Sequence, residues 1–208
     1  MRTPSDSVDD QLARIQGKLI AAREHDRRCT RFGAATHQYQ LGSILRPHQM
    51  VTFESDIGWM LPEGFRRFLL ELGNGGAGPA YGWPAVVPEA PLYRQAAWRK
   101  AFETPLAEEL EGDPAGSIAL SNHGCGIFDF VVVNGREGGN VWFSGDTSDV
   151  YPLPGKDFDS LHGAQPKDFG SEAWRGRLAD PANTSRISFL EYYEQWLDEV
   201  LADAKLVR

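Results

Sequence analysis

The chain has 208 residues, 41% of them hydrophobic and 24% charged, and its formal net charge is −8. This length and balance exclude global disorder and predict one folded domain over residues 1–208. The acidic charge argues against a basic nucleic-acid-binding surface and favours a basic partner. No signal sequence and no apolar run of membrane-spanning length is recognisable, so a cytoplasmic protein without membrane contact is expected.

Cysteine usage argues against a metal or disulfide scaffold. The sequence has two cysteines, Cys29 and Cys125. Two thiols cannot build a disulfide framework, and they cannot complete a four-ligand zinc site without distant histidines or carboxylates. We therefore expect reduced thiols, no bound metal and no cofactor.

The N-terminal part, residues 1–58, predicts one helix followed by a variable region. Apolar residues keep a helical spacing between about Ser7 and Arg28, and they are Val8, Leu12, Ile15, Leu19 and Ile20. Glycines and prolines interrupt residues 29–59, so no long element is predicted there. The segment YQLGSIL in this region fits either a strand or a connection.

The next helix ends in a glycine-rich loop. Leu61, Phe65, Phe68, Leu69 and Leu72 share one helical face. Pro62 suits the first turn, and Gly73 suits a left-handed residue after the last. The following letters match Gly-x-Gly-x-x-Gly, but a phosphate site needs this pattern to open a helix, and here it closes one. The glycines therefore predict a helix cap and a chain reversal.

The centre of the chain predicts an antiparallel sheet. A brief strand at 85–87 and a helix interrupted at Pro105 come first. Three β-rich runs follow, SIALS, IFDFVVVNG and VWFSGD, separated by turns, and the last two make a hairpin through residues 135–139. The run Ile127–Val133 is apolar on both faces, so it should be a central strand.

The C-terminal part predicts an insertion and a final helix. Residues 152–184 are rich in glycine, proline and charge and indicate a loop-rich insertion. Ser188 and Glu191 then form a capping box. The apolar stripe of the helix that follows should pack on the sheet, giving an α+β domain with helices flanking an antiparallel sheet.

Catalytic motifs are absent from the sequence, and no catalytic residue is predicted. His123 and Cys125 are the best thiol and imidazole pair, but nothing identifies a third group that would orient the histidine, and a structural turn is favoured. The other four histidines, His25, His37, His48 and His162, are expected at the surface. A hydrolase that uses His123 with Asp146 and Asp149 is the least favoured reading.

Several residues allow either a structural or a binding role. Asp146 and Asp149 follow a strand, where aspartates usually form turns but can also bind metal. Asp129 stands in an apolar strand, so it should either bond to the glycine loop or line a binding pocket. Tyr81 and Trp83 either fold back over the helix or remain exposed as contacts for a protein partner.

Three blocks in this order resemble the SUKH superfamily, which includes yeast cell-wall-synthesis regulators and many bacterial immunity proteins of polymorphic toxin systems. They are LPEGFRRFLLELGNGGAGPAYGW, GCGIFDFVVVNGREGGNVWFSGD and FLEYYEQWLDEVL, and they cover roughly Trp59 to Leu201. The family positions map onto Asn74, Gly75, Gly76, Tyr81, Gly82, Gly126, Asp129, Trp142 and Asp146.

The resemblance implies a non-enzymatic protein that binds and neutralises a cognate toxin, and the acidic charge fits a basic nuclease-type toxin. The alternative is a regulatory module that binds an endogenous partner. The residues expected to contact the partner are Asn74, Tyr81, Trp83, Asp129, Trp142 and Asp146.

Overall fold

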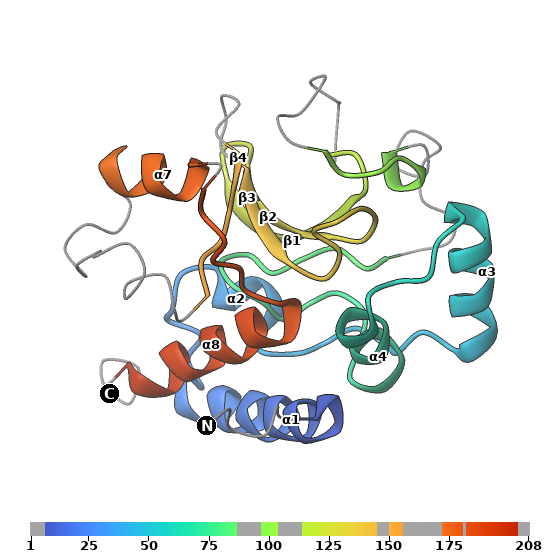
Figure 1. Ribbon diagram of the computed structural model, residues 1–208. Coiled ribbons are helices and arrows are strands. Elements are labelled where there is room, and N and C mark those ends of the chain that lie inside the picture. The colour runs from blue at the N-terminus through green and yellow to red at the C-terminus, as the bar shows by residue number, and fades with distance from the viewer. Residues whose placement is uncertain are drawn as a thin grey trace.

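The computed structural model describes residues 7–86, 97–103, 114–144, 150–155, 172–180 and 182–203. Helices and a four-stranded antiparallel sheet make up these residues, which confirms the predicted α+β class. Figure 1 shows the sheet on one side of helix α8 (Phe189–Ala202), with helix α1 (Val8–His25) on the other side. No helix within the described ranges is both long and apolar enough to cross a membrane.

The sheet contains the three predicted strands and one more. Strands β1 (Ser117–Gly124), β2 (Ile127–Val132), β3 (Val141–Ser144) and β4 (Val150–Pro152) follow in sequence order, each antiparallel to the next. β2 is an inner strand, as its apolar character predicts. β4 has only three residues and carries too short a pattern to be recognised in the sequence.

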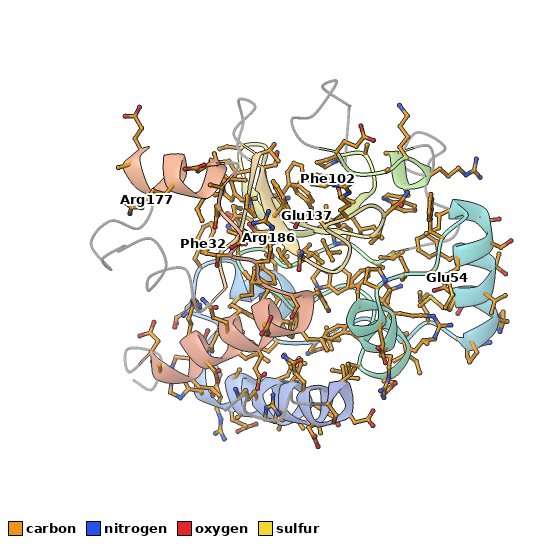
Figure 2. All side chains as sticks on the ribbon, in the orientation of Figure 1. Phe32, Glu54, Phe102, Glu137, Arg177 and Arg186 are labelled. Carbon is orange, nitrogen blue, oxygen red and sulfur yellow. The ribbon has the colours of Figure 1, made fainter. Side chains whose placement is uncertain are left out.

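The two faces of β2 contribute to two separate cores. Val131 faces the main core, which also contains most of the buried apolar side chains of the helices. Phe130 faces the other side, where it packs with Trp142 and Phe102 in a smaller cluster. Figure 2 shows Phe102 on the side of the sheet away from α8. Successive side chains of β2 therefore point alternately to the face of the sheet that carries α8 and to the opposite face.

Helix α8 (Phe189–Ala202) connects the sheet to α1 (Val8–His25). Its predicted capping box is present, because the Ser188 amide donates to the Glu191 carboxylate at 3.0 Å and the Glu191 amide donates to the Ser188 hydroxyl at 3.4 Å. The apolar side of α8 is buried in the main core, which also contains sheet residues, as predicted. Two of its carboxylates, those of Glu194 and Asp198, contact α1.

An ion cluster joins α1 to α8. The Glu194 carboxylate accepts from Arg14 Nε at 2.8 Å and from Lys18 Nζ at 2.9 Å. Burial alone would raise the pKa of Glu194, but the hydrogen bonds from Arg14 and Lys18 outweigh it and lower that pKa to about 2. The carboxylate therefore stabilises the folded state fully above its ordinary pKa of 4.5, and this contribution is lost as the pH falls toward 2.

Glu194→Gln should lower the free energy of unfolding by about 1–2 kcal/mol at neutral pH, because both cations are partly exposed and screened by solvent. Urea denaturation at pH 7 and pH 3 measures the difference, which should shrink at the lower pH. Asp198→Asn is the matched control. Its carboxylate also contacts Lys18, at 2.6 Å, but is 55% exposed, so a loss below about 0.5 kcal/mol is expected. Equal losses for the two variants would contradict this account.

Two helices form in the region where the sequence predicted no long element. They are α2 (Ala34–His37) and α3 (Pro47–Ile57). Pro47 occupies the first turn of α3, and Gly58 ends it in a left-handed conformation, so these residues bound the helix rather than prevent it. The segment YQLGSIL is a connection with one isolated bridge, from Leu41 to Gly76.

His37 is buried, so its predicted surface position is wrong. Its Nδ1 accepts a hydrogen bond from the Tyr39 amide at 3.0 Å, and its ring packs edge-on against Trp196. Burial lowers the pKa of His37 and favours the neutral imidazole. The histidine is therefore part of the core beneath α8.

Helix α4 (Glu63–Glu71) confirms the predicted amphipathic helix, with its caps placed differently. Pro62 is the N-cap residue and lies just before the first turn. The left-handed glycines are Gly75 and Gly76, whereas Gly73 does not adopt a positive φ. Arg66 contacts Glu54 of α3 at 2.9 Å, so α3 and α4 are tied together on the right side of Figure 2.

The glycine loop is a junction of backbone segments. The Gly76 amide donates to the Trp83 carbonyl at 2.9 Å, and the Ala77 amide donates to the Gln40 carbonyl at 2.8 Å. A Cβ at Gly76 would lie 2.4 Å from the Gln40 oxygen, so no side chain fits there. The Asn74 side chain bonds both the amide and the carbonyl of Val86 at 2.7 Å, and residues 85–86 do not form the predicted strand.

The remaining predictions on long segments are only partly covered by the described residues. Residues 97–99 are helical, and Trp98 packs on Phe53 of α3. The predicted helix break at Pro105 lies outside the described residues, as does much of the insertion predicted at 152–184. Within that insertion, helix α7 (Glu172–Ala179) packs on β4 and buries Leu178 against Tyr151.

Candidate binding pocket

Asp129 is the centre of a buried polar network between the sheet and α8. It is 4% exposed, and its Oδ2 accepts from the Tyr192 hydroxyl at 2.5 Å and bonds His123 Nε2 at 2.9 Å. The Ser121 and Tyr192 hydroxyls are 2.7 Å apart. Because Tyr192 donates its proton to Asp129, Ser121 donates to Tyr192. The predicted bond from Asp129 to the glycine loop is wrong, since its partners come from β1 and α8.

The Asp129 carboxylate orients the His123 ring, a role that the sequence did not reveal. The hydrogen bond to Asp129 raises the pKa of His123 and outweighs burial, which would lower it. With Nε2 bonded to Asp129, Nδ1 is the ring nitrogen left for a ligand. The same carboxylate, together with burial, raises the pKa of Tyr192, so the phenol stays protonated as a donor. The network therefore fixes an imidazole beside α8.

This network forms one wall of a pocket of about 970 Å³. The other walls are residues 30–32 after α1, Pro79 and Ala80 of the glycine loop, residues 153–154 after β4, and one side of α8. On α8, the lining residues Tyr192, Gln195, Trp196, Glu199 and Asp203 recur at helical spacing. Asp129 thus lines a pocket, which is the second role considered for it.

Charges in the pocket are dominated by carboxylates. Of the residues that the structure describes, Asp129, Glu199 and Asp203 line it together with the Arg31 guanidinium. Arg31 Nη2 lies 3.1 Å from Glu199 Oε2, and Nη1 lies 4.0 Å from Asp203 Oδ2. The Glu199 side chain is nevertheless 55% exposed. Glu199 therefore remains accessible to solvent although it is paired with Arg31.

An exposed aromatic pair stands at the edge of the pocket. Phe32 is 62% exposed and Tyr81 is 42% exposed, and their ring centroids are 5.0 Å apart. Figure 2 shows Phe32 on the side of the molecule away from Glu54. A Cβ at Gly33 would lie 1.9 Å from the Ala80 carbonyl oxygen, so the glycine allows the two segments to meet. This close approach brings the neighbouring side chains of Phe32 and Tyr81 together.

Backbone hydrogen bonds hold this part of the glycine loop against the sheet. The Tyr81 amide donates to the Asn122 carbonyl of β1, and the Asn122 amide donates to the Gly82 carbonyl, both at 3.1 Å. Tyr81 is thus exposed on a segment that is fixed at its backbone. An aromatic side chain held in this way loses little conformational entropy when a partner covers it.

The residues predicted to contact a partner lie in different environments. Tyr81 and Asp129 lie at the pocket and its edge. Asn74 and Trp83 are buried, and Trp83 folds back over Phe65 of α4. Trp142 is 5% exposed on the opposite face of the sheet, beneath Arg186. Asp146 lies outside the described residues, as does Asp149.

Sequence reasoning did not select Phe32, Arg31, His123 or Glu199 as binding residues. Phe32 and Arg31 lie in a segment whose apolar residues follow no helical or strand period. Their role becomes visible only in the structure, where Phe32 packs on Tyr81 and Arg31 pairs with Glu199 of α8. The signal that could have been used is on α8, where Tyr192, Trp196, Glu199 and Asp203 follow at i, i+4, i+7 and i+11. This stripe shares Trp196 with the apolar side of α8.

Comparison with known proteins found no matching family, no matching curated protein and no matching solved structure. The site is therefore interpreted from its own residues. Within the described ranges, no group of three or more histidine, cysteine, aspartate or glutamate side chains is arranged to hold a metal ion.

Asp129→Asn should lower the pKa of His123, because the amide replaces the carboxylate that stabilises the imidazolium. An NMR titration of the His123 ring measures this directly. Asp56→Asn, an exposed aspartate on α3, is the control and should leave that titration unchanged. Since the pKa of His123 is raised, the pair stabilises the fold below pH 6.5, and this is lost as the pH rises through the folded value. An unchanged His123 pKa in Asp129→Asn would contradict the assigned hydrogen bond.

Proposed function

We propose that this protein is a non-enzymatic immunity protein, which binds a basic, nuclease-type toxin and neutralises it by covering or distorting its active site. The observation that carries the proposal is the exposed Phe32–Tyr81 pair beside an acidic pocket. Aromatic side chains at the centre of a contact supply a large share of binding energy, and charges at its edge steer the encounter.

The preorganisation of the aromatic pair supports a protein partner. Both rings project from segments that are fixed by close backbone contacts at Gly33 and Asn122. Exposed aromatic rings cost free energy in water, and a rigid exposed pair is typical of a surface that a partner covers. The partner contact would therefore centre on Tyr81, one of the residues selected from the sequence, and on Phe32.

The charge distribution supports a basic partner. The chain carries a net charge of −8, and some of its carboxylates line the pocket beside the aromatic pair. Opposite charges on two proteins accelerate association, and the effect weakens with salt. A nuclease domain must itself hold phosphate groups with lysine and arginine, so its surface would be complementary to this one.

In this proposal the His123–Asp129 pair has a structural role. The Asp129 carboxylate already accepts hydrogen bonds from Tyr192 and from the imidazole, and the Ser121 hydroxyl is engaged with Tyr192. Their satisfied bonds hold β1, β2 and α8 in register beneath the pocket. We assign no reaction to these groups.

Co-expression with the toxin encoded beside this gene should rescue growth, and the two proteins should co-purify. The Phe32→Ala, Tyr81→Ala double variant should weaken the complex by roughly 100-fold, because truncation of central aromatic contacts typically costs 2 kcal/mol or more. Met60→Ala is the control, since this side chain is 76% exposed near α4. Isothermal titration calorimetry compares the affinities, and far-UV circular dichroism checks that each variant is folded.

Absence of both rescue and co-purification would refute the immunity function. In that case, recovery of a non-toxin protein whose binding also requires Phe32 and Tyr81 would favour the regulatory alternative. Full affinity of the double variant for the toxin would instead show that another face makes the contact.

A further inference from the structure

The pocket has the chemistry of a receptor for one cationic, planar side chain. Among the residues that the structure describes, three carboxylates, those of Asp129, Glu199 and Asp203, and one guanidinium, that of Arg31, line it. Aromatic side chains, Phe32, Tyr192 and Trp196, line the same space. Carboxylates beside aromatic rings favour a guanidinium over an ammonium, because the planar group stacks on a ring while it donates to a carboxylate.

Arg31 shows how such a group binds. Its guanidinium donates to the Glu199 carboxylate at 3.1 Å and to the Glu199 carbonyl at 3.4 Å. It lies in the segment that also carries Phe32. The Glu199 side chain is 55% exposed, and its charge also contributes to the raised pKa of Tyr192. Glu199 therefore faces both the solvent and the pocket, and it can accept from a second donor.

We infer that this pocket receives an arginine side chain of the partner protein, and that Arg31 competes with it for Glu199 in the free protein. The inference rests on the proposed function, since it assigns the chemistry of the partner residue that enters beside Phe32 and Tyr81. In the complex, the incoming guanidinium stacks on Phe32 and donates to Glu199. Arg31 then shares or gives up that carboxylate.

If Arg31 competes with the incoming arginine for Glu199, substitutions of Arg31 and of Glu199 should change the affinity for arginine in opposite directions. Removing the carboxylate should weaken binding of an arginine, whereas removing Arg31 should strengthen it. A purely structural ion pair would not give this result. Substituting either Arg31 or Glu199 would then change the stability of the fold in the same direction, and neither would change the affinity for arginine specifically. The sign of the Arg31 effect is therefore the decisive readout.

The pocket can be tested without the toxin. L-argininamide is titrated into the labelled protein while NMR follows the ring signals of Phe32, Tyr192 and Trp196. Saturable shifts with a Kd on the order of 1 mM are expected for so small a ligand. L-citrullinamide, in which a neutral urea replaces the guanidinium, is the matched ligand and should give no saturable shift.

Variants then test the competition. Glu199→Gln should weaken argininamide binding roughly 10-fold, and Arg31→Met, which keeps an aliphatic stem, should strengthen it roughly 3-fold. The Arg67–Glu71 pair of α4 offers matched controls with the same charge changes, because its Nε and Oε1 atoms are 2.6 Å apart at an exposed site. Arg67→Met and Glu71→Gln should change the affinity less than about 2-fold.

The affinities of the same four variants for the toxin are then measured. Glu199→Gln should again weaken binding and Arg31→Met should again strengthen it, while the two controls should change it little. Glu199-dependent binding of argininamide without any toxin complex would support the pocket and refute the immunity function. A tight toxin complex that is insensitive to Glu199→Gln and Arg31→Met would refute the arginine pocket and leave the immunity function standing. Equal binding of argininamide and citrullinamide, or equal effects of the two ion pairs, would also overturn the inference.

Discussion

The fold depends on the close approach of backbone segments at the glycine loop. Gly76 lies against the Gln40 carbonyl and is hydrogen-bonded to Trp83, and Gly33 lies against the Ala80 carbonyl. These contacts leave no room for a Cβ, so the connection after α1, the loop after α4 and the edge of β1 meet at one place. The Ala77 carbonyl there also accepts from the Tyr193 hydroxyl of α8 at 2.8 Å. One loop thus joins α4, α8 and the sheet.

The pocket is a consequence of this junction and of the Asp129 network. The junction fixes Pro79, Ala80 and the Phe32–Tyr81 pair, while the network of Ser121, Tyr192, Asp129 and His123 fixes α8 on the sheet. A buried carboxylate is costly unless it is well bonded, and here two donors satisfy it. The interior polar group therefore sets the position of the helix that carries Glu199. Fold and binding surface share the same contacts.

Local signals in the sequence are sufficient to predict strands β1, β2 and β3 and helix α8. The runs of β-branched and aromatic residues between turns, and the Ser188–Glu191 box, depend on neighbours within a few positions, and the elements that they predict are confirmed. The sequence does not predict helix α3, because Pro47 and Gly58 are typical of chain interruptions, although they mark the two ends of this helix. β4 was missed because three residues carry no period. Tyr81 and Asp129 are unusual positions in the sequence, but Phe32, which packs on Tyr81, and Tyr192, which bonds Asp129, are distant along the chain. Contacts such as Gly33 with Ala80 arise only after folding, so the sequence could not reveal the pocket.

The central claim is that a partner binds over the Phe32–Tyr81 pair and the pocket beside it. Hydrogen–deuterium exchange of the protein alone and in its toxin complex measures this most directly. The account predicts slower amide exchange in the complex at residues 30–33, 79–82 and 199–203, three segments that are far apart in sequence and adjacent in the structure. Protection confined to α3 and α4, or to the opposite face of the sheet around Trp142, would contradict it.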